Sequence, residues 1–344
     1  MKKIVMFDAK PYDRESFDRL QSQYDFRIKY FENKLNPDTV ALAKGADAVV
    51  AFVNDTIDEQ VIETLHVFGI KILALRCAGY NNVDFTAAYG KLHIVHVPAY
   101  SPYAVAEHAM ALILTLNRKI HRAFNRTREF NFSLNGLTGY DLHGKTIGII
   151  GTGKIGRIFI DICRGFGMHV IAYDLFPAED SDINYVSLDE LLKRSDIISL
   201  HCPLTKETHH IIDEKALNLA KDGVVLINTS RGALIDSLAL TEALKTGKVG
   251  AAGLDVYEEE SEIFFEDFSA IVMQDDILAR LVTMPNVIVT SHQAFLTNEA
   301  LANIAKTTLD NLNLYFTEGD LPNEICYQCK TRPNCDRTHN RPCF

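Results

Sequence analysis

Short apolar runs of strand length alternate with amphipathic helical segments along most of this 344-residue chain. In the N-terminal part, helical patterns at residues 14–24 and 59–68 lie among strand patterns at residues 3–7, 25–31, 48–53, 70–75 and 93–97. Strands that alternate with helices favour a parallel sheet with helices on both faces. This pattern therefore predicts an α/β fold.

A second series of the same kind begins at residue 146. Its strand patterns cover residues 146–150, 169–173, 197–200, 224–228, 249–254 and 287–290, and its helical patterns cover residues 155–166, 188–194 and 237–244. A final helix is expected at residues 298–316, and a long helix from about Pro102 to Asn125 joins the two series. Because apolar side chains cover most of the circumference of the joining helix, we expect it to be buried between domains or between subunits.

The charge balance and the hydropathy exclude several classes of protein. The chain has 35 basic and 45 acidic residues and a net charge of -10, and such a surface repels nucleic acids and acidic membranes. The most apolar stretch, residues 104–116, contains Glu107 and His108 and is too short to span a bilayer. The apolar run near the N-terminus ends at Asp8, which is too early for a signal peptide. We expect a cytoplasmic protein with no nucleic-acid or membrane partner.

A glycine-rich turn follows the first strand of the second series. Its sequence is Gly151-Thr152-Gly153-Lys154-Ile155-Gly156, and it opens the helix expected at residues 155–166. The first glycine allows a tight turn, the second lets the backbone approach a pyrophosphate, and the third lets the helix pack closely on the strand. The helix N-terminus adds free N–H groups and the positive end of a dipole. The turn therefore predicts a dinucleotide site.

Asp174 strengthens this prediction. It follows the next strand, close to the spacing of roughly 20 residues at which a carboxylate binds the adenosine ribose. A carboxylate there would repel the 2′-phosphate of NADP, and no arginine stands beside it, because Leu175 and Phe176 follow. NAD is therefore the expected cofactor.

Three charged residues follow later strands of the same series. Arg231, Glu260 and His292 come after the strands expected at residues 224–228, 249–254 and 287–290. In an open α/β sheet, ligands bind outside the carboxyl ends of the strands, where these residues could converge. An arginine can hold a substrate carboxylate through two parallel hydrogen bonds, and a histidine can exchange a proton with an alkoxide. This combination suits hydride transfer to a 2-keto acid.

Several segments carry a resemblance to the NAD-dependent D-2-hydroxyacid dehydrogenases, and within that family most closely to the fermentative D-lactate dehydrogenases. The resemblance covers residues 1–325. The segments are residues 74–84 (ALRCAGYNNVD), 97–102 (VPAYSP), 151–156 (GTGKIG), 201–205 (HCPLT), 228–236 (NTSRGALID), 255–258 (DVYE) and 292–295 (HQAF).

The resemblance implies roles for the matching residues. Arg231 would bind the substrate carboxylate, His292 would be the acid/base, and Glu260, in preference to Glu258 or Glu259, would be its partner. The other substrate-binding residues would be the backbone amides of Ala78 and Gly79, the hydroxyl of Tyr100 and the rings of Phe52 and Phe295. The cofactor would contact Gly151, Gly153, Lys154, Ile155, Gly156, Asp174, Cys202, Pro203, Thr208, Thr229, Ser230 and Asp255.

The resemblance also implies a discontinuous architecture. Two Rossmann-like or flavodoxin-like parallel-sheet domains are expected, with the NAD domain at residues 101–296 inserted into a substrate domain at residues 1–100 and 297–344. The long helix would join two subunits of a homodimer or homotetramer. The implied reaction reduces pyruvate with NADH to D-lactate. A larger 2-keto acid is the first alternative substrate, and an NADH-sensing corepressor without enzymatic activity is the second alternative function.

The C-terminal tail, residues 326–344, departs from the family. It contains four of the seven cysteines, Cys326, Cys329, Cys335 and Cys343. The spacing does not fit the usual paired zinc module, so no metal site is assigned, although a loosely packed tail, a zinc site and a thiol switch all stay open. The other three, Cys77, Cys163 and Cys202, are scattered as expected for reduced thiols.

Overall fold

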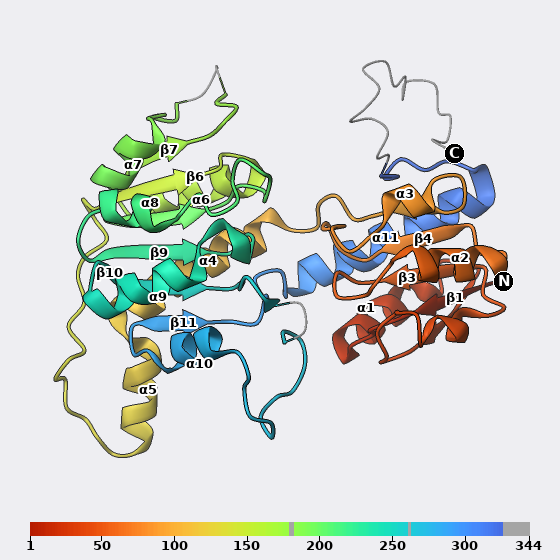
Figure 1. Cartoon of the computed structure of the whole chain (residues 1–344), viewed down its shortest axis with the longest axis horizontal. Helices are drawn as coiled ribbons and strands as arrows, with labels where there is room; N and C mark the ends of the chain where they lie inside the picture. The colour runs from red at the N-terminus through yellow and green to blue at the C-terminus, as the bar shows by residue number, and fades with distance from the viewer. Residues whose placement is uncertain (179–181, 261–262, 326–344) are drawn as a thin grey trace. The chain divides into compact units, whose positions relative to one another are not determined.

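The computed structural model describes residues 1–178, 182–260 and 263–325, and the chain divides into two compact units (Figure 1). The first unit contains Met1–Ser101 together with the chain from Leu296 onward, and the second unit contains Pro102–Phe295. The second unit is therefore inserted into the first. The four cysteines of the tail lie outside the described residues.

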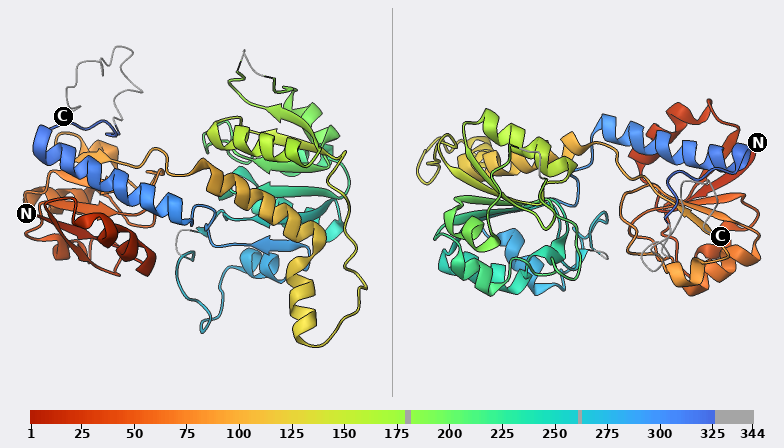
Figure 2. Two further views of the ribbon diagram at one scale, coloured as in Figure 1. Left: turned by 180° about the vertical axis from the view of Figure 1, so that it is seen from behind. Right: turned by 90° about the horizontal axis from the view of Figure 1, so that it is seen from above.

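The first unit is built on a five-stranded parallel sheet in the order β2-β1-β3-β4-β5. Its strands are β1 (Lys2–Met6), β2 (Phe26–Tyr30), β3 (Ala48–Ala51), β4 (Ile72–Leu75) and β5 (His93–Val95). Its helices are α1 (Pro11–Gln21), the 3-10 helix η1 (Val40–Ala43), α2 (Glu59–Val67), α3 (Phe85–Ala88) and α11 (Asn298–Glu318). Helices α1 and α11 cover one face of the sheet and α2 covers the other (Figure 2).

The second unit is built on a six-stranded parallel sheet in the order β11-β10-β9-β8-β6-β7. Its strands are β6 (Thr146–Ile150), β7 (His169–Tyr173), β8 (Ile197–Leu200), β9 (Val224–Asn228), β10 (Val249–Leu254) and β11 (Val287–Val289). Its helices are α4 (Pro102–Arg118), α5 (Ile120–Arg128), α6 (Lys154–Gly165), α7 (Leu188–Arg194), α8 (Glu214–Leu219), η2 (Gly232–Leu234), α9 (Ser237–Thr246) and α10 (Asp276–Thr283). The prediction of two parallel-sheet α/β domains is confirmed.

The helix expected from Pro102 to Asn125 is in fact two helices, so that expectation is wrong. Lys119 adopts a left-handed conformation, with φ of 50°, and separates α4 from α5. The side chain of Asn117, in the last turn of α4, bonds both the amide and the carbonyl of Tyr140, at 2.8 and 2.7 Å. The helix therefore ends where a distant loop engages it, and no glycine or proline marks the break in the sequence.

The apolar side chains of α4 are buried mainly within the second unit, which accounts for its almost continuous apolar surface. Ala106, Ala109 and Ile113 are 0–1% exposed and share one core with Ile149 of β6 and Phe159 of α6. Burial against a second subunit is therefore not required for most of this helix. Among the described residues, no helix is both long and apolar enough to cross a membrane.

Each sheet contains one point where the chain reverses its direction of progress across the strands. In the first unit this switch point lies between β1 and β3, and in the second unit it lies between β6 and β8. The helices that follow neighbouring strands there go to opposite faces, which leaves a crevice outside the carboxyl ends of the strands. These two crevices are where bound molecules are expected.

Candidate active site

All the site residues predicted on the second sheet lie just beyond the carboxyl ends of its strands. The turn that begins at Gly151 follows β6, Asp174 follows β7, and Cys202 follows β8. Arg231 comes three residues after β9, and His292 comes three residues after β11. Because the strands are parallel, one edge of the sheet carries all these segments.

The glycine-rich turn has the geometry that a dinucleotide requires. Gly151 has φ of +97°, and a side chain there would place its first carbon 2.5 Å from the amide nitrogen of Cys202. A side chain at Gly156 would collide with the carbonyl of Gly151, which explains how α6 packs so close to β6. By contrast, a side chain at Gly153, the N-cap of α6, would meet nothing within 4 Å. The open space lies where free amides of the helix N-terminus can bind a pyrophosphate.

Asp174 is held rigidly at the end of β7. One carboxylate oxygen accepts hydrogen bonds from the amide and the hydroxyl of Thr152, at 2.6 and 2.8 Å, and the other accepts one from the amide of Phe176 at 2.9 Å. Partial burial alone would raise the pKa of Asp174, but the hydrogen bonds from Phe176 and Thr152 outweigh it and hold the pKa below its usual value. Asp174 is therefore a fixed anion whose remaining lone pairs can accept ribose hydroxyls.

One hydroxyl group ties the segment after β9 to the segment after β8, and another holds the segment after β8 internally. Ser230 donates to the carbonyl of Cys202 at 2.6 Å, and Thr208 donates to the carbonyl of Pro203 at 2.6 Å. Thr229 is 7% exposed, and its buried hydroxyl has no hydrogen-bond partner among the described residues. An unpartnered buried hydroxyl after β9, at the same edge of the sheet as the glycine-rich turn, is available to a bound molecule, so the residues present fit a dinucleotide.

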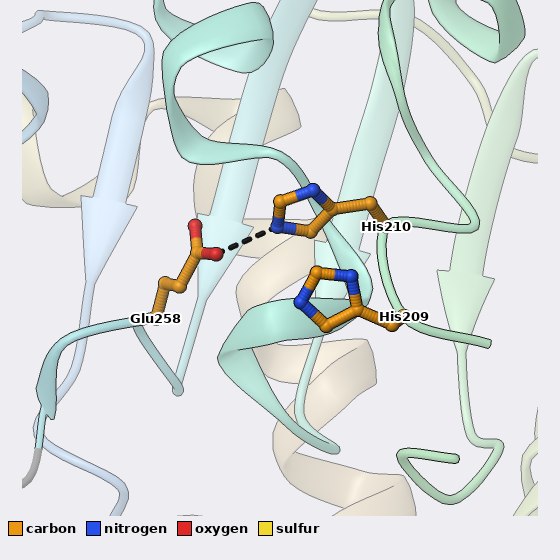
Figure 3. Close-up of side chains that lie close together, drawn as sticks. All are labelled: His209, His210 and Glu258. Carbon is orange, nitrogen blue, oxygen red and sulfur yellow. Dashed lines mark hydrogen bonds and ion pairs between the residues drawn. The ribbon is translucent and has the colours of Figure 1, made fainter. Parts of the chain in front are cut away.

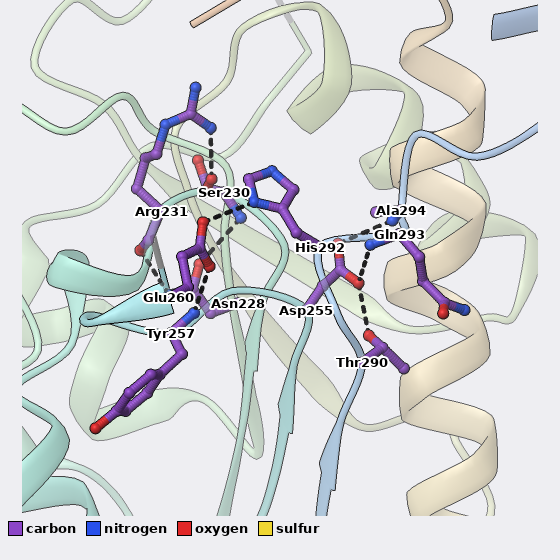
Figure 4. A network of polar contacts seen from close by, with 10 residues as sticks. All are labelled: Asn228, Ser230, Arg231, Asp255, Tyr257, Glu260, Thr290, His292, Gln293 and Ala294. Carbon is purple, nitrogen blue, oxygen red and sulfur yellow. Dashed lines mark hydrogen bonds and ion pairs between the residues drawn. The ribbon is translucent and has the colours of Figure 1, made fainter. Parts of the chain in front are cut away.

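His292 and Glu260 form an ion pair on neighbouring segments (Figure 4). The Nδ1 atom of His292 lies 2.7 Å from Oε1 of Glu260, and the other carboxylate oxygen accepts the amide of Tyr257 at 2.8 Å. Both side chains are about one-fifth exposed. A carboxylate on Nδ1 places the proton there, which leaves Nε2 as the nitrogen that can exchange a proton with a substrate.

A fully buried carboxylate holds the loop that carries His292. Asp255 is 0% exposed, and its carboxylate accepts hydrogen bonds from the hydroxyl of Thr290 at 2.6 Å and from the amides of Gln293 and Ala294, both at 2.9 Å. The carbonyl of Asp255 also accepts the amide of His292 at 2.7 Å. This bonding holds His292 in a left-handed conformation, with φ of 52°. Asp255, expected to contact the cofactor, thus also supports the histidine loop.

Arg231 extends from the loop after β9. Its Nη1 donates to the carbonyl of Ser230 at 2.7 Å, and its own carbonyl accepts the side-chain amide of Asn228 at 2.8 Å. In Figure 4 the guanidinium and the imidazole of His292 extend in the same direction from their loops. The residue is only half-buried, so the outer edge of the guanidinium can bind a carboxylate.

The other substrate-binding residues predicted by resemblance are placed mainly on the first unit. Phe52 follows β3, and Ala78 and Gly79 follow β4. The carbonyl of Ala78 accepts Nδ1 of His96 at 3.0 Å, and the carbonyl of Gly79 accepts the thiol of Cys77 at 3.2 Å, so both peptide groups are held in orientation. Tyr100 also lies in the first unit, whereas Phe295 is the last residue of the second.

Two histidines and a glutamate gather near the same edge (Figure 3). Nε2 of His210 lies 2.6 Å from Oε1 of Glu258, and the ring of His209 stacks on that of His210 at 4.0 Å. The interplanar angle of this stacked pair is 27°, so the nitrogen lone pairs of the two rings lie in nearly parallel planes. This arrangement favours a His210–Glu258 ion pair and explains why Glu260, and not Glu258, is left to pair with His292.

Sequence reasoning missed the residues that support the histidine loop. Nε2 of His108, on α4, lies 3.1 Å from the hydroxyl of Thr290 and 3.3 Å from Asp255. The polar interruption of α4 by Glu107 and His108 was a usable signal, because a half-buried histidine in an apolar helix needs a partner. The hydroxyl of Tyr257, which bonds Asp275 at 2.8 Å, carried no comparable signal.

Comparison with known proteins agrees with this geometry. The family model for the D-isomer specific 2-hydroxyacid dehydrogenase, NAD binding domain, matches residues 110–294. The chain is 51% identical over 314 residues to a 2-hydroxyacid dehydrogenase homolog of Haemophilus influenzae, covering 90% of this chain and 95% of that protein. It is 49% identical over 327 residues to the D-lactate dehydrogenase of Escherichia coli K12, covering 94% and 99%. The solved pyruvate reductase of Chlamydomonas reinhardtii has a TM-score of 0.89 at 42% identity, covering 94% and 98%.

Proposed function

Because the chain belongs to the D-isomer-specific 2-hydroxyacid dehydrogenases, a family of NAD-binding oxidoreductases, we propose that it is a D-lactate dehydrogenase that interconverts pyruvate and D-lactate. One observation carries the proposal: a histidine–glutamate ion pair and an arginine lie on adjacent strand ends of the sheet that bears the dinucleotide turn. These groups supply a proton and a carboxylate anchor for a 2-keto acid.

His292 exchanges the proton in the proposed reaction. Its Nε2 donates a proton to the keto oxygen of pyruvate as the carbonyl carbon is reduced, and it removes the proton from the hydroxyl of D-lactate in the reverse direction. Glu260 stabilises the imidazolium and holds the ring through Nδ1. NADH, when bound, would supply the hydride and thereby be oxidised to NAD.

Arg231 and the first unit hold the substrate in this proposal. The guanidinium of Arg231 and the backbone amides of Ala78 and Gly79 bind the carboxylate, while the hydroxyl of Tyr100 contributes a further hydrogen bond. The rings of Phe52 and Phe295 are the proposed apolar contacts of the substrate's side chain. The preference for pyruvate over larger 2-keto acids rests on these two rings.

The proposed cofactor contacts lie in the segments that follow strands β6 to β10. Backbone amides at Gly153, Lys154 and Ile155 bind the pyrophosphate, and Asp174 accepts the ribose hydroxyls and disfavours NADP. The remaining proposed contacts are Gly151, Gly156, Cys202, Pro203, Thr208, Thr229, Ser230 and Asp255. We assign residues 101–296 to the NAD domain and residues 1–100 and 297–344 to the substrate domain.

A homodimer or homotetramer is part of the proposal, because apolar side chains are exposed on α5 and the segment after it. Ile120, Phe124, Phe130, Phe132 and Leu134 are 54–83% exposed. Such a concentration of exposed apolar groups is typical of a protein interface. A cytoplasmic location is proposed from the buried, reduced thiols of Cys163 and Cys202. Light scattering after size exclusion would measure the oligomeric state.

One set of assays tests the proposed reaction. NADH oxidation is followed with pyruvate, with 4-methyl-2-oxopentanoate and with buffer alone, and the product is analysed on a chiral column. We expect pyruvate to be reduced fastest, to the D isomer. His292→Ala should lose turnover by roughly three orders of magnitude and keep its NADH affinity. A variant that turns over pyruvate at the wild-type rate would reject the role of His292, and absence of NADH oxidation by the wild type would reject the function.

A further inference from the structure

Polar side chains hold Phe52, the proposed wall of the substrate pocket, from three directions. The carboxylate of Asp55 accepts the amide of Phe52 at 2.6 Å, and the side-chain amide of Asn82 donates to the carbonyl of Phe52 at 2.9 Å. The guanidinium carbon of Arg76 lies 4.0 Å from the centroid of the ring. Both the backbone and the ring of Phe52 are therefore fixed by groups outside its own strand.

Arg76 is itself immobilised. It is 2% exposed, its Nη1 lies 3.1 Å from a carboxylate oxygen of Asp13, and its Nη2 donates to the carbonyl of Asp8 at 2.5 Å. The other oxygen of Asp13 accepts the amide of Lys10 at 3.0 Å. Because the guanidinium is planar and is bound at two nitrogens, the plane that it presents to the aromatic ring is set by the start of α1.

Arg76 also joins the two parts of the proposed substrate site that lie in the first unit. Its backbone amide donates to the carbonyl of Ala51, the residue before Phe52, at 3.0 Å. Arg76 also lies two residues before Ala78 in the sequence, and Ala78 begins the turn proposed to bind the carboxylate. A shift of Arg76 therefore moves the ring and the turn together.

We propose that Arg76 is a positioning residue that sets the substrate size of this enzyme, because it fixes the ring of Phe52 and the Ala78–Gly79 turn relative to each other. Arg76 does not touch the substrate in this proposal; it acts through Phe52. The class of substrate selected in this way is 2-keto acids with a short, unbranched side chain. The inference rests on the proposed function, which places Phe52 against the substrate.

A lysine at position 76 keeps the charge and loses the flat, two-nitrogen contact, so Arg76→Lys is the test variant. We expect the KM for pyruvate to rise roughly tenfold with little change in kcat, and the preference for pyruvate over 4-methyl-2-oxopentanoate to fall roughly tenfold. The dissociation constant of NADH should not change, because the dinucleotide turn lies in the other unit. Arg27→Lys, at an exposed position of β2, is the matched control and should leave all these values unchanged.

A second variant keeps the inference testable if the protein does not fold with lysine at position 76. Asn82→Ala releases the carbonyls of Phe52 and Asp55 but leaves the contacts of Arg76 intact. It should reduce the same preference about threefold, a smaller loss because the ring stays stacked. If Arg76→Lys gives no cooperative unfolding transition, Asn82→Ala decides the question.

The two failures are distinguishable. Folded variants that keep the wild-type preference between the two keto acids overturn the inference, even if their unfolding temperatures fall, because a purely structural role predicts that result. A wild-type chain that reduces neither keto acid overturns the proposed function, and the inference with it. A reduced preference at an unchanged NADH affinity supports both.

Discussion

The two sheets have the same strand order around their switch points, but the space outside the strands is filled differently. After β1, Asp8 stands in a left-handed conformation with φ of 47°, and the buried side chains of Asp55 and Arg76 occupy the region outside β1, β3 and β4. After β6, Gly151 stands in a left-handed conformation with φ of 97°, and Gly153 leaves open space. The same topology is therefore filled by buried polar side chains in the first unit and left open at Gly153 in the second, the unit that matches the NAD-binding family model.

In both units the parallel sheet leaves a crevice outside the strand ends at its switch point. The size of the side chains there decides whether the crevice is filled by the protein or open to a ligand. Glycines keep the crevice of the second unit accessible to backbone amides. In the first unit, buried charges must be bonded to protein groups, because an unpaired charge in that position is costly. A substitution that fills the open crevice should weaken NADH binding, and a substitution that loosens the filled crevice should reduce stability.

The largest effect is expected from Gly153→Asp, which fills the open crevice. Aspartate is a favourable N-cap and its Cβ would meet no atom within 4 Å, so the free energy of unfolding should stay constant or rise by up to about 1 kcal/mol. The added carboxylate repels the pyrophosphate, so NADH affinity should fall at least ~100-fold. Fluorescence titration and thermal unfolding measure both quantities, with Gly165→Ala, at the exposed end of α6, as control. Unchanged affinity for NADH would contradict the assignment of the crevice.

The next effect is expected from Asp55→Asn in the filled crevice. The two carboxylate oxygens accept the amides of Phe52 and Leu35, both at 2.6 Å, and an asparagine can accept only one of them. Near pH 4 the free energy of unfolding should fall by about 1–3 kcal/mol. Urea unfolding measures the loss, and Asp38→Asn, at an exposed position, is the control. A variant as stable as the wild type would show that these hydrogen bonds contribute little.

The same variant tests the titration of Asp55. Burial raises its pKa to about 7, despite the hydrogen bonds from Phe52 and Leu35. Between about pH 4 and pH 7 the unfolded chain releases this proton and the folded chain keeps it, so this group destabilises the wild type by up to ~1.4 kcal/mol per pH unit as the pH rises. The deficit of Asp55→Asn should therefore be largest near pH 4 and should vanish or reverse in sign toward pH 7. A deficit that is constant with pH would exclude the raised pKa.

A smaller effect is expected from Asp174→Ala in the open crevice. Loss of the ribose hydrogen bonds should weaken NADH binding about tenfold, and loss of the negative charge should bring NADPH binding closer to that of NADH. The ratio of the two dissociation constants is the measurement. Asp161→Ala, on the exposed face of α6, should leave the ratio unchanged. A ratio unchanged in Asp174→Ala itself would remove this residue from the cofactor site.

The smallest effect is expected from Asp8→Asn. The negative charge of Asp8 contributes to the raised pKa of Asp55, so its removal should move the pH-dependent loss of stability downward by less than about one pH unit. Asparagine tolerates the left-handed conformation, so the backbone should not change. Unfolding measured between pH 4 and pH 8 gives the shift. An upward shift would show that Asp8 acts on Asp55 through contacts other than its charge.

The strands of the second unit could be predicted from the sequence because buried parallel strands are continuous apolar runs. Five of them, from β6 to β10, have the predicted bounds, and β11 ends one residue earlier. The helices α3, α8 and α10 were not predicted, because segments this short contain little periodicity; α7, equally short, was predicted at residues 188–194. The break at Lys119 depends on a contact with a distant loop, which no local pattern records.

The candidate site was predictable where the residue types and their spacing at strand ends indicate a specific chemistry. The glycine turn, Asp174 and the three charged residues stand at strand ends that the pattern itself located. The support of the site was not predictable: the bonds of Asp255 and the contact between Arg76 and Phe52 join segments that are far apart in the sequence. Their geometry arises only when the sheets are assembled.

The insertion of the second unit has a consequence for the order in which the chain can fold. The core of the first unit includes Ala305, Leu309 and Leu312 of α11, and about 200 residues of the second unit separate this helix from Ser101. Synthesis proceeds at roughly 5–20 residues per second, so about ten seconds or more pass between the last strand of the first sheet and the helix that covers one of its faces. The second unit has all its strands before then. The nascent protein thus completes the strands of the unit that matches the NAD-binding family model while the first unit still exposes an apolar face of its sheet.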